Sequence, residues 1–474
     1  MKGKRAMWHT AEMISVHCGQ SAVFDYLADM TNIVAWDPSV ASSRRLTHGP
    51  LAVGSRFHLI VAFGPRQVPM DYEVAEMASP DRLVLIGRGA GFTATDDITL
   101  TTAQDITRID YRVTLTFDTA PPAPAAGIMR QLFLRSVRRA ARRLAAVFNG
   151  TEPLPRVTLP VFTADHAIVP GLAGFTRWGY HWARHHRPFA AALLENRTIV
   201  LTGATGGIGL AAAQTLHRLG ANLILVGRNR EKTETTRETL LKDGGAGFIH
   251  CEIADMSLMA DVQRLAQRLL DGGRPIQVLV NNAGALFNAR EETAEGVEKS
   301  FAVNLLGPYF LSRLLLPRLR ENRPARIINV ASGGMYTQKL AVDDLDSVQT
   351  QYAGPDAYAR AKRGLVVAGR LMAKALWKDG VCIHAMHPGW VDTPGLRTAL
   401  PGFYNRLRPW LRSPSEGADT IVWLCGAAEG ELTSGFFWRD RRPRVAYVFP
   451  GTRETPSDAG LLMAALKRRL DTVL

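Results

Sequence analysis

The sequence has few cysteines and no long apolar run, and both absences exclude classes of protein. The four cysteines, Cys18, Cys251, Cys382 and Cys425, form no CxxC pair, so neither a zinc site nor a disulfide framework is indicated. This cysteine usage fits a reducing, cytoplasmic compartment. No run of 18 apolar residues occurs, which argues against a membrane-spanning helix. The basic start has no apolar stretch behind it, which argues against a secretory signal.

Composition and charge narrow the choice further. The chain has 474 residues, of which 46% are hydrophobic and only 21% charged, so it forms two or three folded domains and is not largely disordered. Its net charge of +14 is uneven: residues 1–118 carry −2, residues 119–194 carry +8 and residues 195–474 carry +8. The middle segment is the most basic per residue. This pattern favours contact with an anionic surface and argues against a uniformly basic nucleic-acid binder.

The first 118 residues are expected to be mainly β-structure. Apolar and polar residues alternate strictly over Ile109–Phe117, which is typical of a strand with one buried face. Weaker strands are predicted at about 54–63, 69–78 and 82–89. A short helix is predicted over Ser21–Ala28, with Ser21 as a candidate N-cap.

A basic helix is predicted to end this front half. Residues 119–127 break the β pattern with their prolines, and a helix from Ile128 to Phe148 follows. One face of this helix is apolar. The other face carries Arg130, Arg135, Arg138, Arg139, Arg142 and Arg143, with no acid among them. Residues 150–170 are expected to form an extended, proline-containing linker.

From Asn196 onward, short apolar strands alternate with helical segments. The strands are TIVLTG, NLILVG, VLVNNAG and RIINVAS, in that order along the chain. This alternation predicts an α/β fold with a doubly wound parallel sheet of the Rossmann type.

A glycine-rich loop follows the first of these strands. Residues Thr202 to Gly209 read TGATGGIG, and a helix is expected to begin within them. Glycines allow the backbone to approach a pyrophosphate closely, and the helix N-terminus offers free N–H groups. Tight turns are also common, so such a loop alone is weak evidence.

Further motifs follow in order and together are highly specific. Asn281-Asn282-Ala283-Gly284 follows a strand, Asn304 lies on a later helix, and Ser332 ends the strand RIINVAS. Tyr358 and Lys362 form YxxxK, and Pro388-Gly389 through Thr393 follow the next strand. In these motifs residues 195–450 resemble the short-chain dehydrogenase/reductase family. The stretches SGGMYTQKL, MHPGWVDTPG and SEGADT are especially similar to the group called dehydrogenase/reductase family member twelve.

The chemistry of hydride transfer suits these residue types. Reduction of a ketone leaves negative charge on oxygen, which needs a proton donor. Tyr358 is the expected acid/base, and Lys362, on the same helical face, is expected to lower its pKa. The resemblance implies that Lys362 also binds the nicotinamide ribose, that Ser332 holds the substrate oxygen and that Asn304 supports a proton relay. Taken alone, the tyrosine and lysine are an ordinary amphipathic pair and Asn304 a capping residue. The other motifs, which occur in the expected order along the chain, argue against that interpretation.

The resemblance also implies which residues hold the cofactor. They are Thr202, Gly203, Gly207, Ile208, Gly209, Arg228, Asp255, Asn282, Ala283, Gly284, Tyr358, Lys362, Pro388, Gly389 and Thr393. Arg228 stands where an acid would bind the ribose hydroxyls of NAD, and it can pair with a 2′-phosphate, so NADP is favoured over NAD. The alternatives are a solvated Arg228 and, for Asp255, a simple turn residue.

Twenty-five residues separate Ser332 from Tyr358, more than in the shortest members of this family. This insertion is expected to shape the substrate pocket. Tyr336 and Tyr352 lie within it and either line the site or pack against the domain.

The front half resembles the START-like polyketide cyclase/dehydrase group. The resemblance rests on VFDYLADMTNIVAWDPSV, the turn at Gly54, and Pro80 before RLVLIGRG. It implies an α+β helix-grip fold, in which a curved antiparallel sheet wraps a long C-terminal helix and encloses an apolar cavity. Trp36 is either a lid of that cavity or part of the core. No pair of acids or histidines has a spacing that demands catalysis, so a binding module is preferred to a second enzyme.

Residues 175–189 alternate aromatic and basic side chains. The aromatic residues are Phe175, Trp178, Tyr180 and Trp182, and their neighbours are Arg177, Arg184, His185, His186 and Arg187. This pattern suits peripheral contact with a membrane surface. The alternative is a helix packed on the reductase domain with its arginines solvated. No carboxylate or cysteine completes a metal site with the histidines, so none is predicted.

The sequence therefore predicts a START-like domain over 1–150, a basic aromatic connector over 151–194 and a short-chain dehydrogenase/reductase domain over 195–474. The leading hypothesis is an NADP-dependent oxidoreductase that interconverts a hydrophobic alcohol and ketone, with the front domain binding or presenting this small-molecule substrate. One alternative is a lipid-binding or transfer protein whose reductase-like half senses NADP(H). Another is a tandem polyketide cyclase and ketoreductase. The family resemblance implies a homo-oligomer, unless the added domain blocks the usual contacts.

Overall fold

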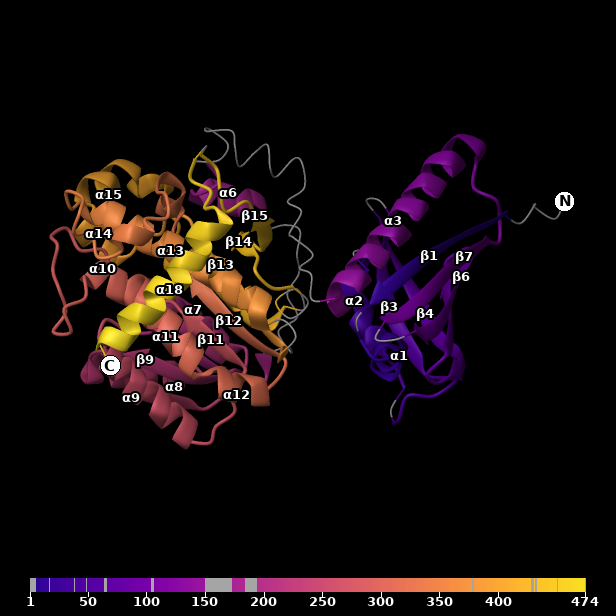
Figure 1. Cartoon of the computed structure of the whole chain (residues 1–474), viewed down its shortest axis with the longest axis horizontal. Helices are drawn as coiled ribbons and strands as arrows, with labels where there is room; N and C mark the ends of the chain where they lie inside the picture. The colour runs from indigo at the N-terminus through magenta and orange to yellow at the C-terminus, as the bar shows by residue number, and fades with distance from the viewer. Residues whose placement is uncertain are drawn as a thin grey trace. The chain divides into compact units, whose positions relative to one another are not determined.

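The computed structural model describes residues 6–16, 18–37, 39–47, 49–63, 66–103, 106–149, 173–183, 194–376, 379–427, 430, 433–449 and 451–473. The chain forms two compact units, Met1–Leu154 and Pro155–Leu474 (Figure 1). The predicted linker over 150–170 lies outside the described residues, as do Arg184, His185, His186 and Arg187. Within the described part of the chain, no helix has the length and apolar character needed to cross a bilayer.

The first unit is a seven-stranded antiparallel sheet that holds one long helix. The strands run in the order β1-β7-β6-β5-β4-β3-β2. They are β1 (Ala6–Val16), β2 (Val40–Arg45), β3 (Arg56–Phe63), β4 (Arg66–Ala78), β5 (Arg82–Gly89), β6 (Phe92–Ala103) and β7 (Ile106–Phe117). The helices are α1 (Gln20–Ala28), the 3-10 turn η1 (Met30–Asn32), α2 (Ile33–Trp36) and α3 (Ala123–Asn149). The predicted helix-grip architecture is confirmed.

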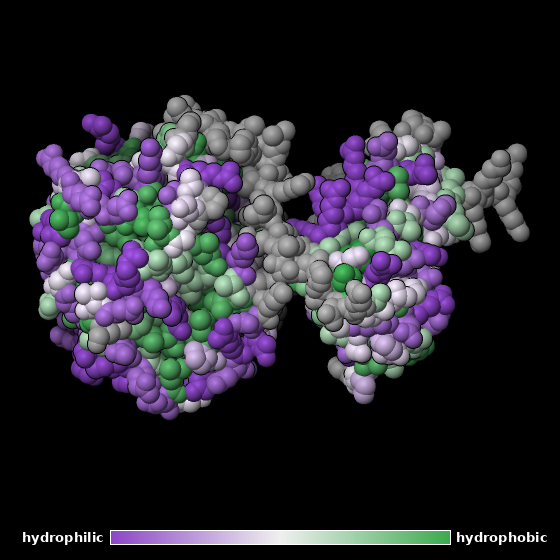
Figure 2. All heavy atoms as spheres, viewed as in Figure 1, coloured by the Kyte–Doolittle hydropathy of each residue, from purple (hydrophilic) through white to green (hydrophobic). Residues whose placement is uncertain are grey.

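Helix α3 packs on the sheet through a single stripe of side chains. Phe133, Val137, Ala140, Ala141 and Leu144 are buried in one core with the inward residues of the strands. Its arginine-bearing face is mostly exposed, and Figure 2 shows hydrophilic side chains gathered over this helix. Arg138 pairs with Glu12 of β1, so the arginine face meets an acid from another element.

Three details of the first unit differ from the sequence prediction. Helix α1 begins at Gln20 with Gly19 as its N-cap, so the prediction of Ser21 as N-cap was wrong. Helix α3 begins at Ala123 and not at Ile128, because proline is tolerated in the first turn, where no intrahelical N–H is needed. The strands β1, β2 and β6 were not predicted. In β6, two adjacent acids interrupt the apolar pattern that marks a strand.

The second unit is an eight-stranded sheet in the order β10-β9-β8-β11-β12-β13-β14-β15. All neighbouring strands pair in parallel except the last hairpin, β14 with β15. The strands are β8 (Thr198–Thr202), β9 (Asn222–Gly227), β10 (Ile249–Ile253), β11 (Val278–Asn281), β12 (Ala325–Val330), β13 (Val381–Met386), β14 (Phe437–Arg439) and β15 (Arg442–Arg444). This arrangement confirms the predicted doubly wound Rossmann-type sheet.

Helices cover both faces of this sheet. One core joins α9 (Met259–Asp271), α11 (Gly307–Leu314), α13 (Gly354–Leu376) and α18 (Pro456–Val473) to the strands. The other core joins α7 (Gly207–Arg218), α8 (Arg230–Lys242) and α16 (Pro414–Gly426). The remaining helices are α6 (Arg177–Ala183), α10 (Lys299–Phe301), α12 (Leu316–Glu321), α14 (Pro394–Ala399) and α15 (Pro401–Leu407). The strand order reverses between β8 and β11, and open α/β sheets bind ligands at the carboxyl ends of strands at such a point.

Candidate active site

The glycine loop joins β8 to the N-terminus of α7. Gly203 and Gly207 have positive φ angles of 67° and 53°, which favour glycine. A Cβ on Gly209 would lie 2.1 Å from the carbonyl oxygen of Gly203, so only glycine allows the turn to close. The N-cap residue Gly206 offers no side chain to the first N–H groups of the helix. These groups are therefore available to an anionic ligand such as a pyrophosphate.

Residues after β11 fix this loop in place. The Asn282 side-chain amide donates to the carbonyl oxygens of Thr202 and Gly203, at 2.9 and 3.1 Å. The backbone N–H groups of Asn282 and Ala283 both donate to Thr202 Oγ1 at 3.0 Å. The structure thus brings together predicted site residues from β8 and β11, and these residues hold the shape of the loop.

The segment after β13 meets the other end of the loop. A Cβ on Gly207 would lie 3.2 Å from Thr393 Cγ2, so Thr393 stands beside the start of α7. The Thr393 side chain also caps α14 by accepting from Leu396 N at 3.2 Å. Ile208 lies near Gly417 of α16, where an added Cβ would be 3.4 Å from Ile208 Cγ1. These contacts place Ile208 and Thr393 at the same edge of the sheet.

The predicted adenine-side residues lie after β9 and β10. Arg228 is exposed directly after β9, and Asn229 next to it caps α8 by accepting from Lys232 N at 2.9 Å. Asp255 Oδ1 accepts from the backbone N–H and the hydroxyl of Ser257, at 2.8 and 2.7 Å. Asp255 therefore stabilises a turn, which is the alternative role that the sequence analysis named for it.

Ser332, Tyr358 and Lys362 converge at the end of β12. Ser332 caps the 3-10 turn η5 (Gly333–Thr337), and its Oγ accepts from Gly334 N at 3.3 Å. The Ser332 hydroxyl also lies close enough to the Tyr358 hydroxyl to lower its pKa. Lys362 Nζ donates to Val330 O at 2.9 Å and lies 5.8 Å from the centroid of the Tyr358 ring. Two elements that are distant in sequence, β12 and α13, therefore present these three side chains together.

Burial sets the protonation of this pair. It raises the pKa of Tyr358, and the Ser332 hydrogen bond opposes that rise. The ammonium of Lys362 is 2% exposed, and its burial lowers the pKa to about 7. Burial therefore raises the pKa of Tyr358 in the protein alone, and the expected lowering of this pKa by Lys362 stays a prediction.

Asn304 lies in the π-helical turn Ala302–Leu306, between α10 and α11. Its amide nitrogen donates to the carbonyl oxygens of Ala285 and Ser300, at 2.8 and 2.9 Å. Its Oδ1 is buried and has no partner among the described residues. A Cβ on Gly284 would lie 2.7 Å from this oxygen and 3.1 Å from Lys362 Nζ. Gly284 therefore leaves open the space that Asn304 and Lys362 both face.

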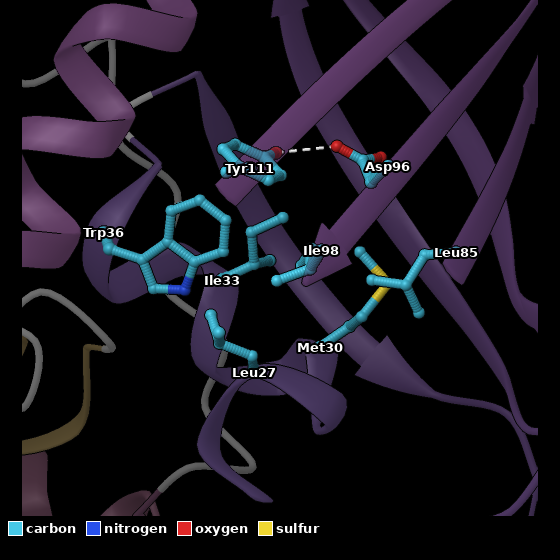
Figure 3. A pocket seen from close by; sticks show the side chains of 8 residues that line it. All are labelled: Leu27, Met30, Ile33, Trp36, Leu85, Asp96, Ile98 and Tyr111. Atoms are coloured by element: carbon cyan, nitrogen blue, oxygen red, sulfur yellow. Dashed lines mark hydrogen bonds between the residues drawn. The ribbon is translucent and has the colours of Figure 1, made fainter. Parts of the chain in front are cut away.

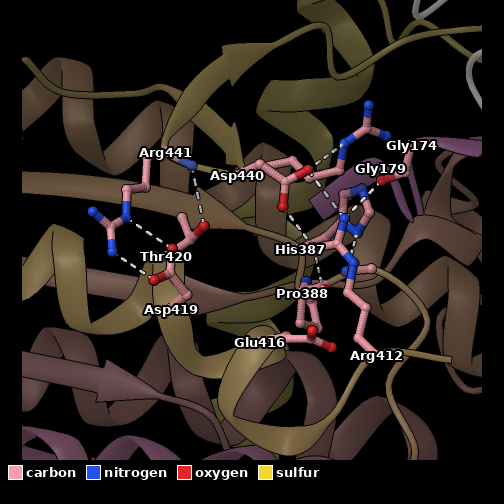
Figure 4. Close-up of polar contacts among 12 residues, drawn as sticks. Gly174, Gly179, His387, Pro388, Arg412, Glu416, Asp419, Thr420, Asp440 and Arg441 are labelled. Carbon is pink, nitrogen blue, oxygen red and sulfur yellow. Dashed lines mark hydrogen bonds and ion pairs between the residues drawn. The ribbon is translucent and has the colours of Figure 1, made fainter. Parts of the chain in front are cut away.

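A buried ion pair supports the Pro388-Gly389 turn. The Arg412 guanidinium bonds both carboxylate oxygens of Asp440, at 2.6 and 3.0 Å, and also donates to Pro388 O at 3.0 Å (Figure 4). Gly389 has a φ of 82°, and a Cβ there would lie 2.4 Å from Arg412 Nε. Its N–H donates to His387 Nδ1 at 3.0 Å. Burial and the neighbouring arginines lower the pKa of His387, so this ring stays neutral and accepts the bond.

The aromatic segment before the sheet packs on this same region. Arg412 also donates to the carbonyl oxygens of Gly174 and Thr176, and its guanidinium lies 5.4 Å from the Tyr180 ring centroid. The Phe175 ring stacks at 6.3 Å on Tyr336 and lies 3.5 Å from the Cβ that Gly333 lacks. Phe175 therefore borders the residue next to Ser332.

The outer face of the segment is exposed. Trp178 and Trp182 are 77% and 86% exposed, whereas Tyr180 is buried. Arg177 and His181 both contact Glu416, at 3.2 and 2.8 Å. The described residues of the segment thus form a helix packed on the reductase domain, although Arg177 is paired and not simply solvated.

The two tyrosines of the insertion have separate structural partners. The Tyr336 hydroxyl donates to Val445 O at 2.8 Å, and its ring borders Phe175. The Tyr352 hydroxyl bonds Glu298, at 3.0 Å, and Ser300, at 3.2 Å. Sequence reasoning missed the contacts by which Phe175, Arg412 and Asp440 border or support the predicted site residues, because nothing in their local sequence marks such long-range contacts.

In the first unit, Trp36 is 4% exposed and lines a small internal cavity. Its ring meets the Tyr111 ring edge-on, with centroids 5.8 Å apart (Figure 3). Trp36 is therefore both part of the core and part of a cavity wall.

Comparisons with known proteins agree with this geometry. Residues 197–401 match the family described as short chain dehydrogenase, and residues 7–149 match the family described as polyketide cyclase/dehydrase and lipid transport. The chain is 37% identical over 303 residues to dehydrogenase/reductase SDR family member 12 of Bos taurus, covering 63% of this chain and 94% of that protein. It is 33% identical over 264 residues to polyprenol dehydrogenase of Mus musculus, covering 54% and 78%.

A solved structure is also similar. The Pseudomonas aeruginosa RhlG/NADP active-site complex is 26% identical, with a TM-score of 0.44, and the match covers 52% of this chain and 96% of that one. Both resemblances drawn from the sequence are confirmed by the family matches.

Proposed function

The chain belongs to the short-chain dehydrogenase/reductase family of oxidoreductases, which act on CH–OH groups, and we propose that it is an NADP-dependent enzyme for a hydrophobic alcohol and its ketone. The observation that carries the proposal is the contact of Ser332 and Tyr358, with Lys362 beneath the tyrosine ring, at the end of β12. The glycine loop and the open N-terminus of α7 lie at the same edge of the sheet.

The residues present fit a nicotinamide cofactor. The N-terminus of α7 has free N–H groups for a pyrophosphate, and Gly203, Gly207 and Gly209 leave no side chain in its way. Lys362 is close enough to Tyr358 to hold the nicotinamide ribose beside the acid/base. When bound, the reduced cofactor supplies the hydride that adds to the carbonyl carbon of the substrate.

The chain's own residues handle the proton. As negative charge develops on the substrate oxygen, the Tyr358 hydroxyl donates its proton to that oxygen. Ser332 Oγ accepts from Gly334 N, and its own proton, which faces Tyr358 in the protein alone, can turn to the substrate oxygen once that oxygen is bound. In the reverse direction, the Tyr358 phenolate accepts the proton of the alcohol.

Lys362 and Asn304 replace the proton lost by Tyr358. The unpartnered Asn304 Oδ1 and Lys362 Nζ face the same small space beside Gly284. A buried polar oxygen of this kind is normally paired, and a water there would bond both groups. This supports a relay from solvent through Lys362 to the acid/base.

The preference for NADP rests on Arg228. Its guanidinium is exposed at the end of β9, where the ribose of the adenosine half binds in folds of this type. An arginine can pair bidentately with a 2′-phosphate. Substitution Arg228→Ala is expected to weaken NADPH binding by about 10-fold or more and to leave NADH binding nearly unchanged. Equal affinity of the native protein for NADPH and NADH would contradict the preference.

A hydrophobic substrate is supported by the wall next to Ser332. Phe175, Tyr336 and His387 form an aromatic cluster there, and burial keeps His387 neutral. A relative that is 33% identical bears the name polyprenol dehydrogenase, which names a long apolar alcohol. Turnover measured across carbonyl substrates of rising chain length is expected to show a KM that falls with length.

The front unit is proposed to bind or present this lipophilic substrate. Support comes from its match to the family described as polyketide cyclase/dehydrase and lipid transport, and from its internal cavity. If the whole protein instead transfers lipid and only senses NADP(H), lipid movement between vesicles survives Tyr358→Phe. If the front unit is a cyclase, a rearranged product disappears when that unit is deleted.

A further inference from the structure

The cavity of the first unit contains an acid in an otherwise apolar wall. Asp96 is 5% exposed and lies on β6, on the same face as the buried residues Ala94 and Ile98. Six apolar side chains from α1 to α2 and from the sheet line the rest of the space. They are Leu27, Met30, Ile33, Trp36, Leu85 and Ile98. A buried carboxyl costs folding free energy, so its place in a cavity wall marks a candidate functional group.

Strand register explains how two tyrosines reach this acid. Tyr111 of β7 pairs with Ile98, two residues along β6 from Asp96, and a diagonal neighbour is within reach of a long side chain. The Tyr111 hydroxyl donates to Asp96 Oδ1 at 2.6 Å (Figure 3). Tyr72 of β4 lies opposite Gly87 of β5, and its ring occupies the space that a Cβ on Gly87 would fill. The Tyr72 hydroxyl therefore reaches across β5 towards Asp96 and lowers the pKa of that carboxyl.

This cluster offers hydrogen-bond acceptors to a ligand and no free donors. When Asp96 is ionised, Tyr111 donates its proton to the carboxylate, and the negative charge also attracts the proton of the nearby Tyr72 hydroxyl. What remains is a set of oxygen lone pairs, which can only accept hydrogen bonds. A ligand hydroxyl, which is a donor, satisfies them, whereas a ketone oxygen, which is only an acceptor, does not. A site with unpaired buried polar groups discriminates strongly against a ligand that cannot pair them.

We propose that this cavity is a binding site for an apolar alcohol, whose hydroxyl donates to the cluster of Asp96, Tyr72 and Tyr111. The inference rests on the proposed role of the front unit in binding a lipophilic substrate. It adds that the front unit binds the alcohol in preference to the ketone. It does not depend on redox activity in the second unit.

The size of the cavity fits the polar end of such a ligand. Its volume is about 10 Å3, roughly enough for one water molecule, and therefore for a hydroxyl group. The alkyl chain requires the surrounding side chains to move. Met30 is among them, and its unbranched, flexible side chain readily adapts to new shapes.

The charged surroundings of Asp96 make the preference depend on pH. Burial raises the pKa of Asp96 to about 6, nearby Asp37 raises it further, and the two tyrosine hydrogen bonds oppose the rise. Arg143 of α3 faces Asp37 and not Asp96 directly. Above about pH 6 the carboxylate is ionised and the cluster only accepts. Below that pH its proton becomes available to a ketone, so discrimination is expected to fall.

Calorimetric titration of the full-length protein with 2-decanol and with 2-decanone tests the inference. At pH 8 the native protein is expected to bind the alcohol about 10-fold more tightly than the ketone at a site distinct from the reductase centre. Asp96→Asn supplies amide donors, so it is expected to abolish or reverse this preference, and Tyr111→Phe is expected to weaken binding of the alcohol. The matched control is Asp97→Asn, because Asp97 points the other way and pairs with Arg82.

The outcomes separate this inference from the reductase proposal. NADPH oxidation, measured on the same variants, is expected to persist with a short soluble carbonyl substrate. An alcohol preference that is absent in the native protein, or that survives Asp96→Asn, or that is lost equally in Asp97→Asn, overturns the inference. None of these results affects the assignment of Tyr358, whose own variant tests the reductase.

Discussion

The hydroxyl of Ser332 at the end of β12 lies beside the hydroxyl of Tyr358 on α13 and lowers the pKa of that tyrosine. Two oxygens that would both contact a substrate carbonyl are thus neighbours before any ligand binds. The neighbouring Lys362 is held by Val330 O of the same strand end. The positions of the three groups are therefore set by the sheet and by one long helix.

Replacing Tyr358 by phenylalanine removes the proton donor and leaves the ring. Turnover is expected to fall by about 100-fold or more, in the usual range for loss of general acid catalysis. The Kd for NADPH, measured by fluorescence titration, is expected to change little. Tyr352→Phe is the matched control, because its hydroxyl bonds Glu298 and Ser300 outside the site. Native turnover in Tyr358→Phe would contradict the mechanism.

Replacing Lys362 by methionine tests the cost of burying its ammonium. The pKa of Lys362 is lowered to about 7 in the folded protein, so the unfolded chain binds more protons from there to about pH 10. The loss in free energy of unfolding that the buried ammonium causes is fully present below pH 7 and becomes smaller as the pH rises. Lys362→Met is expected to raise the Tm at pH 7, with a difference that shrinks towards pH 10. A difference in Tm that is independent of pH would contradict the shift.

Replacing Phe175 by alanine tests whether the segment before the sheet contacts the bound substrate. Phe175→Ala removes a ring that borders Gly333 and stacks on Tyr336. The KM for a long apolar carbonyl substrate is expected to rise by about 10-fold, since the contact of a partly buried aromatic side chain contributes on the order of 1–2 kcal/mol, while the Kd for NADPH is unchanged. Trp178→Ala, on the exposed face of the same segment, serves as control. Equal changes in KM for both variants would contradict the role of Phe175.

Breaking the buried ion pair of Arg412 and Asp440 is expected to be strongly destabilising, because it leaves one buried charge without its partner. Both side chains are nearly inaccessible, at 1% and 2% exposure. Asp440→Asn leaves the guanidinium without its counter-charge, and the free energy of unfolding of the second unit is expected to fall by about 3–5 kcal/mol. Chemical denaturation measures this loss. Asp392→Asn, which breaks the more exposed pair with Arg397, is expected to change stability little.

Peripheral membrane contact is proposed through Trp178 and Trp182. Both rings are exposed on one face of α6, and interfacial tryptophans favour the boundary of a bilayer. The native protein is expected to sediment at low salt with vesicles of phosphatidylcholine and phosphatidylserine. The double substitution to alanine is expected to reduce the bound fraction, and Trp410→Ala to leave it unchanged. A native protein that stays in the supernatant would contradict the proposal.

The sequence predicted those parts of the fold and site that depend on local patterns. Most of strand β7 was predicted because apolar and polar residues alternate strictly over Ile109–Phe117. Strand β6 was missed because Asp96 occupies an inward position that the pattern reserves for apolar residues. That same irregularity is the signal that would have located the cavity cluster, although its partners Tyr72 and Tyr111 lie on other strands.

The reductase site was more predictable than its chemistry. Thr202, Asn282, Ser332, Tyr358 and Lys362 all meet at the predicted edge, because parallel strands carry their carboxyl ends to one side. The direction in which the pKa of Tyr358 shifts was not predictable, since it depends on how deeply Tyr358 and Lys362 are buried. Contacts such as that of Phe175 with Gly333 join segments far apart in the chain, and no local pattern reports them.

The most direct test of the central claim is transfer of deuterium from NADPH labelled at the nicotinamide C4 position to an apolar ketone. Mass spectrometry of the extracted product alcohol measures the label for each stereoisomer of the cofactor. The result expected here is one deuterium in the alcohol formed by the native protein, from one stereoisomer only, and an amount of labelled alcohol lower by about 100-fold or more in the reaction of Tyr358→Phe over the same time. An unlabelled product across a panel of apolar ketones and aldehydes, or an equal amount of labelled alcohol formed by Tyr358→Phe in the same time, would contradict the assignment of an NADP-dependent reductase.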